Sequence, residues 1–323
     1  MVKQEITVGI LGAGAFGTAL AMAFSRDARF EVTLFSCFDE HVSSMRQSLV
    51  NEFFPNFEIS RNVEIETTKA LASRRFDYLL WTFPVAPTLE ILAGIARNID
   101  GSDVIICSKG LLRNAEFLYD AFERVLPHSR VGYLAGANFA HELAAGKIAA
   151  ADVAARDISV ARDFASVLSI DALRLYPTED VIGAQICGAV KNIIAIAAGI
   201  AQGLNSGQNA HAALITKGLS EMRELGIKLG GKAETFLGIC GIGDLILTAS
   251  SEHSRNMSLG IHIAKQHTCD KGSQENGTCE GRDTVVQVVE LARRNNVRLP
   301  ICETVFGILF RKLPATAIIN VIR

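Results

Sequence analysis

Short β-branched runs alternate with segments of helical length through the N-terminal part of the chain, and this alternation constrains the fold more than any other feature. The expected strands are Ile6–Leu11, Val32–Ser36, Val63–Glu66, Tyr78–Thr82, Val104–Ser108, Val131–Ala135, Ala150–Ala154 and Ala172–Tyr176. Helix-length segments such as Ala86–Asn98 and Ala115–Leu126 separate most of them. Strands that alternate with helices form a parallel sheet with helices on both faces. We therefore predict an α/β fold with a doubly wound, mostly parallel sheet.

The alternation stops at Pro177, and almost every later segment has a helical pattern. The expected helices are Ile182–Gly203, Ala210–Leu229, Arg255–Lys265, Thr284–Asn295 and Glu303–Phe310. Ile193–Ile200 is rich in alanine and apolar on every side, which is typical of a helix that is buried all round. A chain of 323 residues suits two domains of roughly 100–200 residues each. We predict one domain at residues 1–180 and an all-α domain at residues 181–323.

Composition excludes several classes of protein. Hydrophobic residues make up 49% of the chain, which excludes intrinsic disorder. The 32 Lys and Arg against 34 Asp and Glu give a formal net charge of −2, and no long basic run stands out. Attraction of the whole chain to nucleic acid or to acidic lipid therefore has no support, and we expect no nucleic-acid partner. An anionic ligand would need a local site.

The cysteines form no Cys-x-x-Cys pair, so zinc-site and thioredoxin-type interpretations fail. They are Cys37, Cys107, Cys187, Cys240, Cys269, Cys279 and Cys302. Small buried thiols in a reducing compartment are the favoured interpretation, and we predict no metal site. The apolar stretch Val8–Phe24 contains four glycines and is shorter than a spanning helix of about 20 residues. We expect a cytoplasmic protein with no membrane anchor.

A glycine-rich motif, Gly12-Ala13-Gly14-Ala15-Phe16-Gly17, follows the first expected strand and opens the apolar helix Thr18–Ser25. In this spacing Gly12 allows a tight turn, Gly14 a close approach of the backbone to a diphosphate, and Gly17 close packing of helix and strand. The helix N-terminus adds free N–H groups and a partial positive charge. We predict a dinucleotide-binding site of the Rossmann type here, in preference to a merely structural turn.

The preferred dinucleotide stays open, because the residue that usually decides it is missing. An Asp or Glu at the end of the second strand binds the ribose hydroxyls and favours NAD, whereas an Arg there favours NADP. Ser36 and Cys37 occupy this position, and Asp39 follows a little later. The sequence therefore predicts NAD or NADP as the cofactor without choosing between them.

Two lysines stand in contexts that suggest chemistry. Lys191 lies in Gly188-Ala189-Val190-Lys191-Asn192, just before the expected buried helix segment. A lysine there is either a snorkelling side chain or a general acid/base whose pKa is lowered by burial and by a neighbouring cation. Lys109, at the end of an expected strand, is a candidate for that neighbour, because ligands bind at the carboxyl ends of such strands.

Two later groups complete the candidate site. Asp244 is one acid among apolar residues, with Thr248 one helical turn later; it could cap a helix, hold an ammonium group, or do both. Ser254-Arg255-Asn256 opens a helical pattern and offers a hydroxyl, a forked cation and an amide at one N-terminus. That combination suits a small phosphate. The alternative is that Ser254 only caps the helix and that Arg255 is only solvated, because this would give the same sequence pattern.

Taken together, these segments resemble the bacterial type of NAD(P)-dependent glycerol-3-phosphate dehydrogenase over most of the chain. The motifs that carry the resemblance are Gly12 through Leu20, Cys107-Ser108-Lys109-Gly110, Ala135 through Ala140, Gly188 through Ile196, Asn209 through Gly218, Gly243-Asp244-Leu245, Ser254-Arg255-Asn256 and Glu280-Gly281. The Lys-Asn, Gly-Asp-Leu and Ser-Arg-Asn segments are specific when they occur together in this order.

The resemblance implies interconversion of dihydroxyacetone phosphate and sn-glycerol 3-phosphate, usually in the reducing direction that supplies phospholipid synthesis. It implies that Lys191 transfers the proton. The substrate site that it implies comprises Lys109, Gly136, Asn138, Lys191, Asp244, Ser254, Arg255 and Asn256, with Asn192 and Thr248 in support. The residues that it implies at the dinucleotide, besides the loop glycines, are Ala15, Phe16, Lys109, Ala140, Arg255, Thr278 and Glu280. It also implies a homodimer.

Four positions depart from the usual pattern of this family. Cys37 stands where bacterial members often carry a basic residue, and Ala137 replaces a common proline. Gln185 and Gln202 stand where acids are more usual. None of the four takes part in the implied proton or phosphate chemistry, but Cys37 weakens any inference of a preference for NADP.

Two other functions remain as alternatives. A related β-hydroxyacid dehydrogenase also uses a lysine on the first helix after its nucleotide domain, but typically with an Asn one turn later, where this chain has Ala195. Such an enzyme also has no use for a phosphate-binding group. A non-catalytic dinucleotide-binding sensor would need only the glycine-rich half, whereas this chain also carries the lysines, the acid and the arginine of the implied substrate site.

Overall fold

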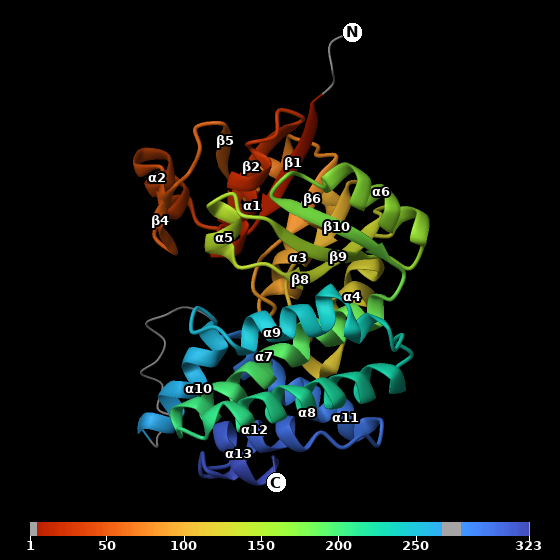
Figure 1. Ribbon diagram of the computed structural model, residues 1–323. Helices are drawn as coiled ribbons and strands as arrows, with labels where there is room; N and C mark the ends of the chain where they lie inside the picture. Colours follow the sequence, from red (N-terminus) through yellow and green to blue (C-terminus); the bar gives the residue numbers. More distant parts are fainter. Residues whose placement is uncertain (1–4, 267–278, 323) are drawn as a thin grey trace. The chain divides into compact units, whose positions relative to one another are not determined.

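A computed structural model describes residues 5–266 and 279–322, and the chain divides into two compact units (Figure 1). Unit 1 comprises Met1–Ser108, Leu118–Leu134 and Asn138–Glu179. Unit 2 comprises Lys109–Phe117, Ala135–Ala137 and Asp180–Arg323. Two short segments from the N-terminal part of the chain therefore cluster with the later, helical part.

An eight-stranded sheet forms the centre of the α/β part, and all of the predicted strands are present. They are β1 (Ile6–Leu11), β2 (Phe30–Ser36), β5 (Val63–Thr67), β6 (Tyr78–Trp81), β7 (Asp103–Ile106), β8 (Val131–Ala137), β9 (Ala149–Ala154) and β10 (Leu173–Thr178). Their order is β10-β9-β8-β7-β6-β1-β2-β5. The pairs β1–β2, β1–β6, β2–β5, β6–β7, β7–β8 and β9–β10 are parallel. The prediction of a doubly wound, mostly parallel sheet is confirmed.

The segments between the strands form helices and one small hairpin. The helices are α1 (Ala15–Phe24), α2 (Asp39–Ser48), α3 (Thr88–Ile99), α4 (Leu118–Val125), α5 (Ala140–Ala144) and α6 (Ile158–Leu168), with a 3-10 turn η1 (Thr68–Ala72). The antiparallel strands β3 (Val50–Asn51) and β4 (Phe54–Glu58) form the hairpin. This hairpin was not predicted from the sequence.

The helix expected over Ala115–Leu126 begins three residues late, at Leu118. The cause is a left-handed backbone at Asn114 (φ 62°) and Ala115 (φ 60°), within the turn η2 (Arg113–Ala115). Residues with a Cβ rarely adopt this conformation. Two such residues in succession interrupt the right-handed helix, so α4 cannot begin before them.

Alternation along the strands gives the sheet two apolar faces, as expected for a parallel sheet covered on both sides. On one face, residues such as Ile10 and Leu80 share a buried cluster with side chains of α1, α5 and α6. On the other, the fully buried Trp81 meets Phe122 of α4, with ring centroids 5.0 Å apart. Because both faces of the sheet are buried, the sequences of the strands are nearly continuous apolar runs.

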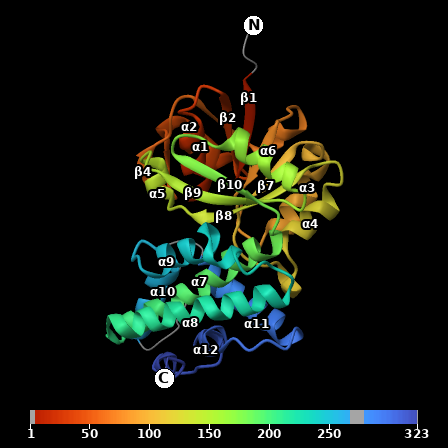
Figure 2. The ribbon, with the colours of Figure 1, turned by 45° about the vertical axis from the view of Figure 1, so that its right-hand side comes forward.

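Unit 2 is helical apart from its short N-terminal segments, as predicted. Its helices are α7 (Val181–Gly203), α8 (Gly207–Lys228), α9 (Asp244–Ala249), α10 (Arg255–Gln266), α11 (Glu280–Arg294), α12 (Pro300–Phe310) and α13 (Ala317–Asn320). A 3-10 turn η3 (Thr235–Leu237) and a π-helical turn η4 (Ile239–Gly243) precede α9. Figure 2 shows α7 within this unit, where it contacts α8 through α13.

Helix α7 is the core of unit 2. It is the one helix among the described residues that is long and apolar enough to cross a membrane, but 94% of its most apolar stretch is buried inside the protein. The side chain of Asp180 caps its start by accepting a hydrogen bond from Gly183 N at 2.8 Å. A Cβ on Gly199 of α7 or on Gly260 of α10 would collide with backbone atoms of the other helix, so glycine at these positions allows the two helices to pack closely.

Candidate active site

The glycine-rich loop of unit 1 has the geometry that its sequence predicts. Gly12 has φ +120°, and a Cβ there would lie 2.8 Å from the backbone nitrogen of Phe83. A Cβ on Gly14 would meet nothing within 4 Å, whereas one on Gly17 would collide with the carbonyl of Gly12. The turn, the open approach and the tight packing that a dinucleotide loop requires are all present.

The start of α1 is open to an anion. Gly14 is its N-cap, has an extended backbone and supplies no capping side chain, so the first amides of the helix have no side-chain acceptor. Ala15 and Phe16, two of the predicted cofactor residues, form the first turn. The side chain of Thr82, at the end of β6, steadies the loop by donating a hydrogen bond to the carbonyl of Gly12 at 2.7 Å.

The side-chain nitrogen and oxygen of Asn138 are buried but lack a partner among the described residues. Among the described residues, neither its amide nitrogen nor its amide oxygen makes a hydrogen bond. Buried amide groups are normally paired, and leaving one unpaired costs about 1–3 kcal/mol. Asn138 belongs to unit 1, just before Ala140 at the start of α5. Its free donor and acceptor are what a polar ligand would satisfy.

The predicted lysines meet on one carboxylate in unit 2. Lys191 Nζ lies 2.6 Å from Asp244 Oδ1, and Lys109 Nζ lies 2.9 Å from Asp244 Oδ2. Lys109 also donates to the carbonyl of Gly136 at 3.0 Å, and Lys191 to Thr248 Oγ1 at 3.1 Å. We call Lys109, Lys191, Asp244, Thr248 and Gly136 the lysine cluster. Five residues predicted for the site, Gly136 among them from the family resemblance alone, therefore form one hydrogen-bonded group.

Local backbone geometry directs Asp244 into the lysine cluster. It is the first residue of α9 and follows the π-helical turn Ile239–Gly243. Within that turn Gly241 has ψ −105°, and a Cβ there would collide with the backbone of Phe236. Such π-type turns are frequent at functional sites. Thr248 follows one helical turn later and thereby lies beside the same carboxylate.

Burial controls the protonation of Lys191. Its side chain is 6% exposed and that of Asp244 is 2% exposed. Burial lowers the pKa of Lys191 to about 8; the carboxylate of Asp244 opposes this shift, and the charge of Lys109 adds to it. An amine with a pKa near 8 can release and recover a proton close to neutral pH, as a general acid/base must.

The other two members of the charged trio stay ionised. Burial acts to raise the pKa of Asp244, but the charges of Lys109 and Lys191 outweigh it and hold that pKa below its ordinary value. Burial acts to lower the pKa of Lys109, but attraction to Asp244 outweighs it and raises that pKa. Lys191 is therefore the member of the trio whose charge changes most readily.

A second polar group joins the starts of α10 and α11 to α7. Asn256 Nδ2 donates to Asn192 Oδ1 at 2.9 Å, and Asn256 Oδ1 accepts from Gly281 N at 3.1 Å. A Cβ on Gly281 would lie 2.6 Å from Asn256 Oδ1, so a glycine is needed there. Glu280 begins α11 in this region; burial raises its pKa, against the attraction of Arg255.

Ser254 and Arg255 lie at the start of α10. Ser254 is buried, and its hydroxyl accepts a hydrogen bond from Met257 N at 3.4 Å, so the capping interpretation of this serine is correct. Arg255 is exposed and close enough to Glu280 to affect the pKa of that residue. Both of these predicted residues lie in unit 2 with the lysine cluster. Thr278, another predicted cofactor residue, lies outside the described residues.

Comparison with known proteins decides the family. Models of NAD-dependent glycerol-3-phosphate dehydrogenase match residues 7–161 (N-terminal part) and residues 180–320 (C-terminal part). The chain belongs to this family. A glycerol-3-phosphate dehydrogenase [NAD(P)+] of Thiobacillus denitrificans is 38% identical over 323 residues, covering 96% of this chain and 95% of that protein. The crystal structure of a glycerol-3-phosphate dehydrogenase from Coxiella burnetii has a TM-score of 0.91 at 31% identity and covers 98% of both chains.

Membership of the glycerol-3-phosphate dehydrogenase family confirms the predicted resemblance, the oxidoreductase class and the use of NAD or NADP. A further member, from Francisella tularensis subsp. novicida, is 38% identical over 307 residues, which cover 93% of this chain and 92% of that protein. The comparisons favour this family over the β-hydroxyacid alternative. They leave the preference between the two dinucleotides open.

The four residues expected to depart from the family pattern lie outside the lysine cluster. Cys37 is half-buried just after β2, and burial raises the pKa of its thiol. Ala137 is the last residue of β8. Gln185 is buried on α7, whereas Gln202 binds Glu252 at 2.9 Å.

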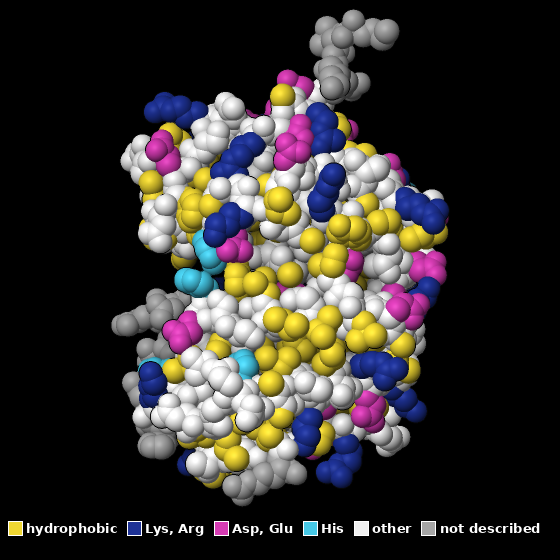
Figure 3. Space-filling model, viewed as in Figure 1, with side chains coloured by type: hydrophobic (Ala, Val, Ile, Leu, Met, Phe, Trp, Pro, Cys, Tyr) yellow, Lys and Arg dark blue, Asp and Glu magenta, His cyan; other side chains and the backbone are white. Residues whose placement is uncertain are grey.

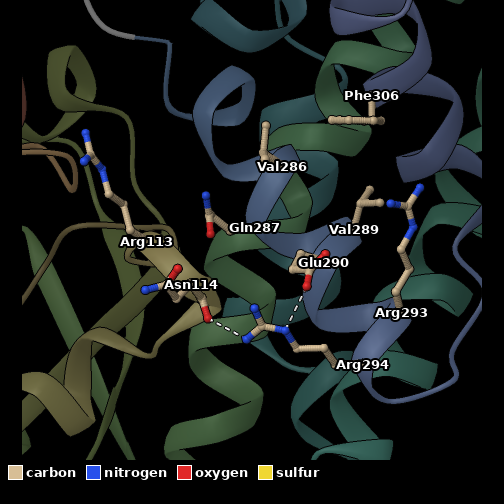
Figure 4. Close-up of a pocket in the computed structure, with 9 residues that line it drawn as sticks. All are labelled: Arg113, Asn114, Val286, Gln287, Val289, Glu290, Arg293, Arg294 and Phe306. Carbon is tan, nitrogen blue, oxygen red and sulfur yellow. Dashed lines mark hydrogen bonds and ion pairs between the residues drawn. The ribbon is translucent and has the colours of Figure 1, made fainter.

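A pocket of about 480 Å³ lies elsewhere in unit 2, along α11. Figure 4 shows its lining residues, which are Arg113, Asn114, Val286, Gln287, Val289, Glu290, Arg293, Arg294 and Phe306. Arg294 donates hydrogen bonds to the carboxylate of Glu290 and to the carbonyl of Asn114, each at 2.9 Å. None of the predicted site residues lines this pocket, so it carries no part of the proposed chemistry.

Proposed function

We propose that this chain reduces dihydroxyacetone phosphate to sn-glycerol 3-phosphate reversibly, with Lys191 as the residue that moves the proton. The observation that carries the proposal is the buried lysine cluster, in which Lys191 lies 2.6 Å from Asp244. Reduction adds a hydride to C2 of the substrate and a proton to the oxygen on that carbon. The proton comes from Lys191 Nζ, and the lysine is protonated again from solvent.

The charge of the cluster favours this step. Lys109 and Lys191 share one carboxylate, so the protonated trio carries one excess positive charge in a buried environment. Negative charge grows on the substrate oxygen during hydride addition, and a fixed cation stabilises it strongly where water is excluded. Asp244 holds both ammonium groups in place and keeps Lys191 from losing its proton too early.

Residues of unit 1 fit the dinucleotide. The open Gly14 and the uncapped amides of α1 supply donors where an anionic cofactor needs them. Asn138, whose side-chain amide is unpaired among the described residues, stays assigned to the substrate, as the family resemblance implies. When bound, the dinucleotide supplies the hydride in reduction and accepts it in oxidation. We assign its diphosphate to the loop of Gly12, Gly14 and Gly17, with Ala15 and Phe16, and we place Ala140, Thr278 and Glu280 as further contacts from the family resemblance.

The phosphate of the substrate is assigned to the start of α10. Arg255 offers a forked cation there, and the first amides of the helix add donors and a partial positive charge. Asn192 and Asn256 are already bound to each other, which sets the direction of both side chains. Anchoring the phosphate fixes the carbonyl carbon at the lysine cluster, which lowers the entropic cost of reaching the transition state.

The remaining features follow from family membership and belong to the proposal. We assign dinucleotide binding to residues 1–180 and substrate chemistry mainly to residues 181–323, with Lys109 and Gly136 as contributions from the first part. We infer that the protein is cytoplasmic and forms a homodimer. We also infer that its product, glycerol 3-phosphate, is used for phospholipid synthesis. Ile227 of α8, Leu237 of η3 and Ile246 of α9 are exposed hydrophobic residues, and Figure 3 shows hydrophobic side chains on the surface of unit 2. Light scattering of the purified protein tests for the dimer.

One assay separates the proposed function from its alternatives. The purified chain is mixed with NADH or NADPH and with dihydroxyacetone phosphate, unphosphorylated dihydroxyacetone or a small β-ketoacid, and dinucleotide absorbance is followed. We expect oxidation of the dinucleotide mainly with the phosphorylated substrate. Turnover with the β-ketoacid alone would support the hydroxyacid alternative. Binding of dinucleotide without turnover of any substrate would support a sensor.

A further inference from the structure

A buried network of polar side chains lies behind the glycine-rich loop of unit 1. It consists of Ser36 at the end of β2, His41 on α2, Asn51 in the β3–β4 hairpin and Thr18 on α1. Their exposed fractions are 3%, 8%, 0% and 0%. None of these side chains was predicted as a site residue, and the hairpin itself was missed.

Asn51 is the centre of this network. Its amide nitrogen donates to the carbonyl of Ala13 at 2.9 Å and to Thr18 Oγ1 at 2.7 Å. Its amide oxygen accepts from Phe53 N at 2.9 Å and lies 3.1 Å from His41 Nε2. An amide side chain has two N–H donors and two acceptor sites, so all four are used.

The partners fix which atom is which. A backbone carbonyl accepts only and a backbone amide donates only, so the nitrogen of Asn51 must face Ala13 and its oxygen must face Phe53. His41 Nε2 therefore carries a proton and donates to that oxygen. In the neutral ring the other nitrogen is then an acceptor, and it lies 3.1 Å from the hydroxyl of Ser36. The hydrogen bonds of the network can therefore all donate in one direction, from Ser36 through His41 and Asn51 to the carbonyl of Ala13.

The bond to Ala13 bears directly on the diphosphate site. Ala13 stands between Gly12, which makes the turn, and Gly14, whose surroundings are open. With the carbonyl of Ala13 held inward by Asn51, the peptide plane that follows has its N–H, that of Gly14, turned the opposite way. A carbonyl released from this bond could rotate toward the diphosphate and repel it.

We infer that Asn51 is a positioning residue of the dinucleotide site, which keeps the glycine-rich loop in the conformation that receives the diphosphate. The inference rests on the proposed function, since it presupposes that the loop binds a dinucleotide. Asn51 is fully buried, and it acts through its hydrogen bonds to Ala13 and Thr18. The β3–β4 hairpin is thereby part of the nucleotide-binding apparatus.

Asn51→Asp tests the donor half of the side chain. Aspartate keeps acceptors for Phe53 and His41 but replaces the donor to Ala13 with a second oxygen. We expect the dissociation constants of NADH and NADPH, measured by dinucleotide fluorescence without substrate, to rise about tenfold or more. The KM for dihydroxyacetone phosphate at saturating dinucleotide should change less than about twofold. Asn56→Asp, at an exposed position of the same hairpin, is the matched control and should bind like wild type.

Two milder variants keep the test decisive if Asn51→Asp does not fold. Thr18→Val removes one acceptor of the Asn51 amide at nearly constant volume, and Ser36→Ala removes the far end of the network. Both should raise the dinucleotide dissociation constants several-fold without raising the KM for the phosphorylated substrate. Wild-type dinucleotide binding by folded variants, or an equal loss for both ligands, would overturn the inference. Failure of the wild-type chain to bind any dinucleotide would instead overturn the proposed function.

Discussion

The two units bury polar side chains in different ways. In unit 1, the side chains of Ser36, His41 and Asn51 form a buried hydrogen-bonded chain that ends on a backbone carbonyl of the glycine-rich loop. In unit 2, the buried polar group is ionic, with Lys109 and Lys191 on the carboxylate of one acid. The first group orients the backbone through hydrogen bonds, whereas the second is an ion cluster.

The difference matches the two tasks. An anionic diphosphate can be held by backbone N–H groups and a helix terminus, so the supporting side chains need no charge and their burial is inexpensive once every hydrogen bond is made. Proton transfer requires a group that changes charge, and burial is what brings its pKa near neutrality. Because an unpaired buried charge costs more free energy than an unpaired neutral group, substitutions in the ionic cluster should lower stability and activity more than substitutions in the network of unit 1.

Removing the titrating amine should produce the largest change. Lys191→Ala deletes the proton donor, and general acid catalysis contributes about 10²–10⁴-fold. We expect kcat for reduction of dihydroxyacetone phosphate to fall by about that factor, while dinucleotide binding to unit 1 is retained. Lys228→Ala, at an exposed position on α8, is the control and should leave kcat unchanged. A Lys191→Ala enzyme with wild-type kcat would remove Lys191 from the mechanism.

Removing the shared carboxylate should mainly reduce stability. Asp244→Asn leaves two buried ammonium groups in contact, and breaking a buried pair costs about 3–5 kcal/mol. The folded-state pKa of Asp244 is lowered, so its stabilising contribution is present at neutral pH and is lost only as pH falls through that lowered value. We expect urea unfolding at neutral pH to show a large loss, which shrinks in acid.

The control for this loss is an ion pair at the surface. Asp39 and Lys69 are paired but exposed, with side chains 64% and 75% accessible, so Asp39→Asn should change the free energy of unfolding little. If Asp244→Asn were as stable as Asp39→Asn, the free energy of unfolding would not depend on the charge of the lysine cluster.

Local patterns explain what could be predicted from the sequence. The strands and α7 are runs whose apolar character is visible residue by residue. Lys191 and Asp244 were found because each is a charge among apolar neighbours. What could not be predicted is long-range: Asn51 lies in a strand of two residues, and its partner Ala13 is 38 positions away.

The predicted start of α4 was wrong because it, too, depends on residues far away in the sequence. The left-handed turn at Asn114 and Ala115 is held by α11, where Gln287 accepts from Ala115 N at 3.0 Å and Arg294 donates to Asn114 O at 2.9 Å. These partners are 172 and 180 positions away in the sequence. No window around residue 115 contains the side chains that decide its backbone.

Removing the exposed cation of the phosphate site should affect binding more than catalysis. Arg255→Ala loses charge-assisted hydrogen bonds worth about 1.5–3 kcal/mol, so the KM for dihydroxyacetone phosphate should rise about 10–100-fold with a smaller change in kcat. Arg255→Lys should recover part of the loss, because it keeps the charge without the forked geometry. Initial-rate kinetics at saturating dinucleotide measure both. Equal losses for phosphorylated and unphosphorylated substrates would contradict a phosphate contact.

The pH dependence of the wild-type enzyme should report the ionic cluster. Burial lowers the pKa of Lys191 to about 8 from an ordinary 10.5, so reduction, which needs the protonated amine, should decline above pH 8, and oxidation should rise there. Over the same interval the folded state binds fewer protons than the unfolded state, so Lys191 makes stability increase with pH. Rates in both directions that stay flat from pH 7 to pH 9 would contradict the assignment.

Adding a charge to the neutral region of unit 1 should have the smallest effect. Cys37→Arg places a cation at the end of β2, where an arginine accommodates the 2′-phosphate of NADP. Cys37 is only half-buried, and charge pairs accessible to solvent contribute little, so kcat/KM with NADPH relative to NADH should rise about two- to fivefold, with kcat unchanged. Cys37→Ser keeps the position uncharged and should leave the ratio as in wild type. If Cys37→Ser shifts the ratio as much as Cys37→Arg, the thiol rather than the missing charge governs selectivity at this strand end.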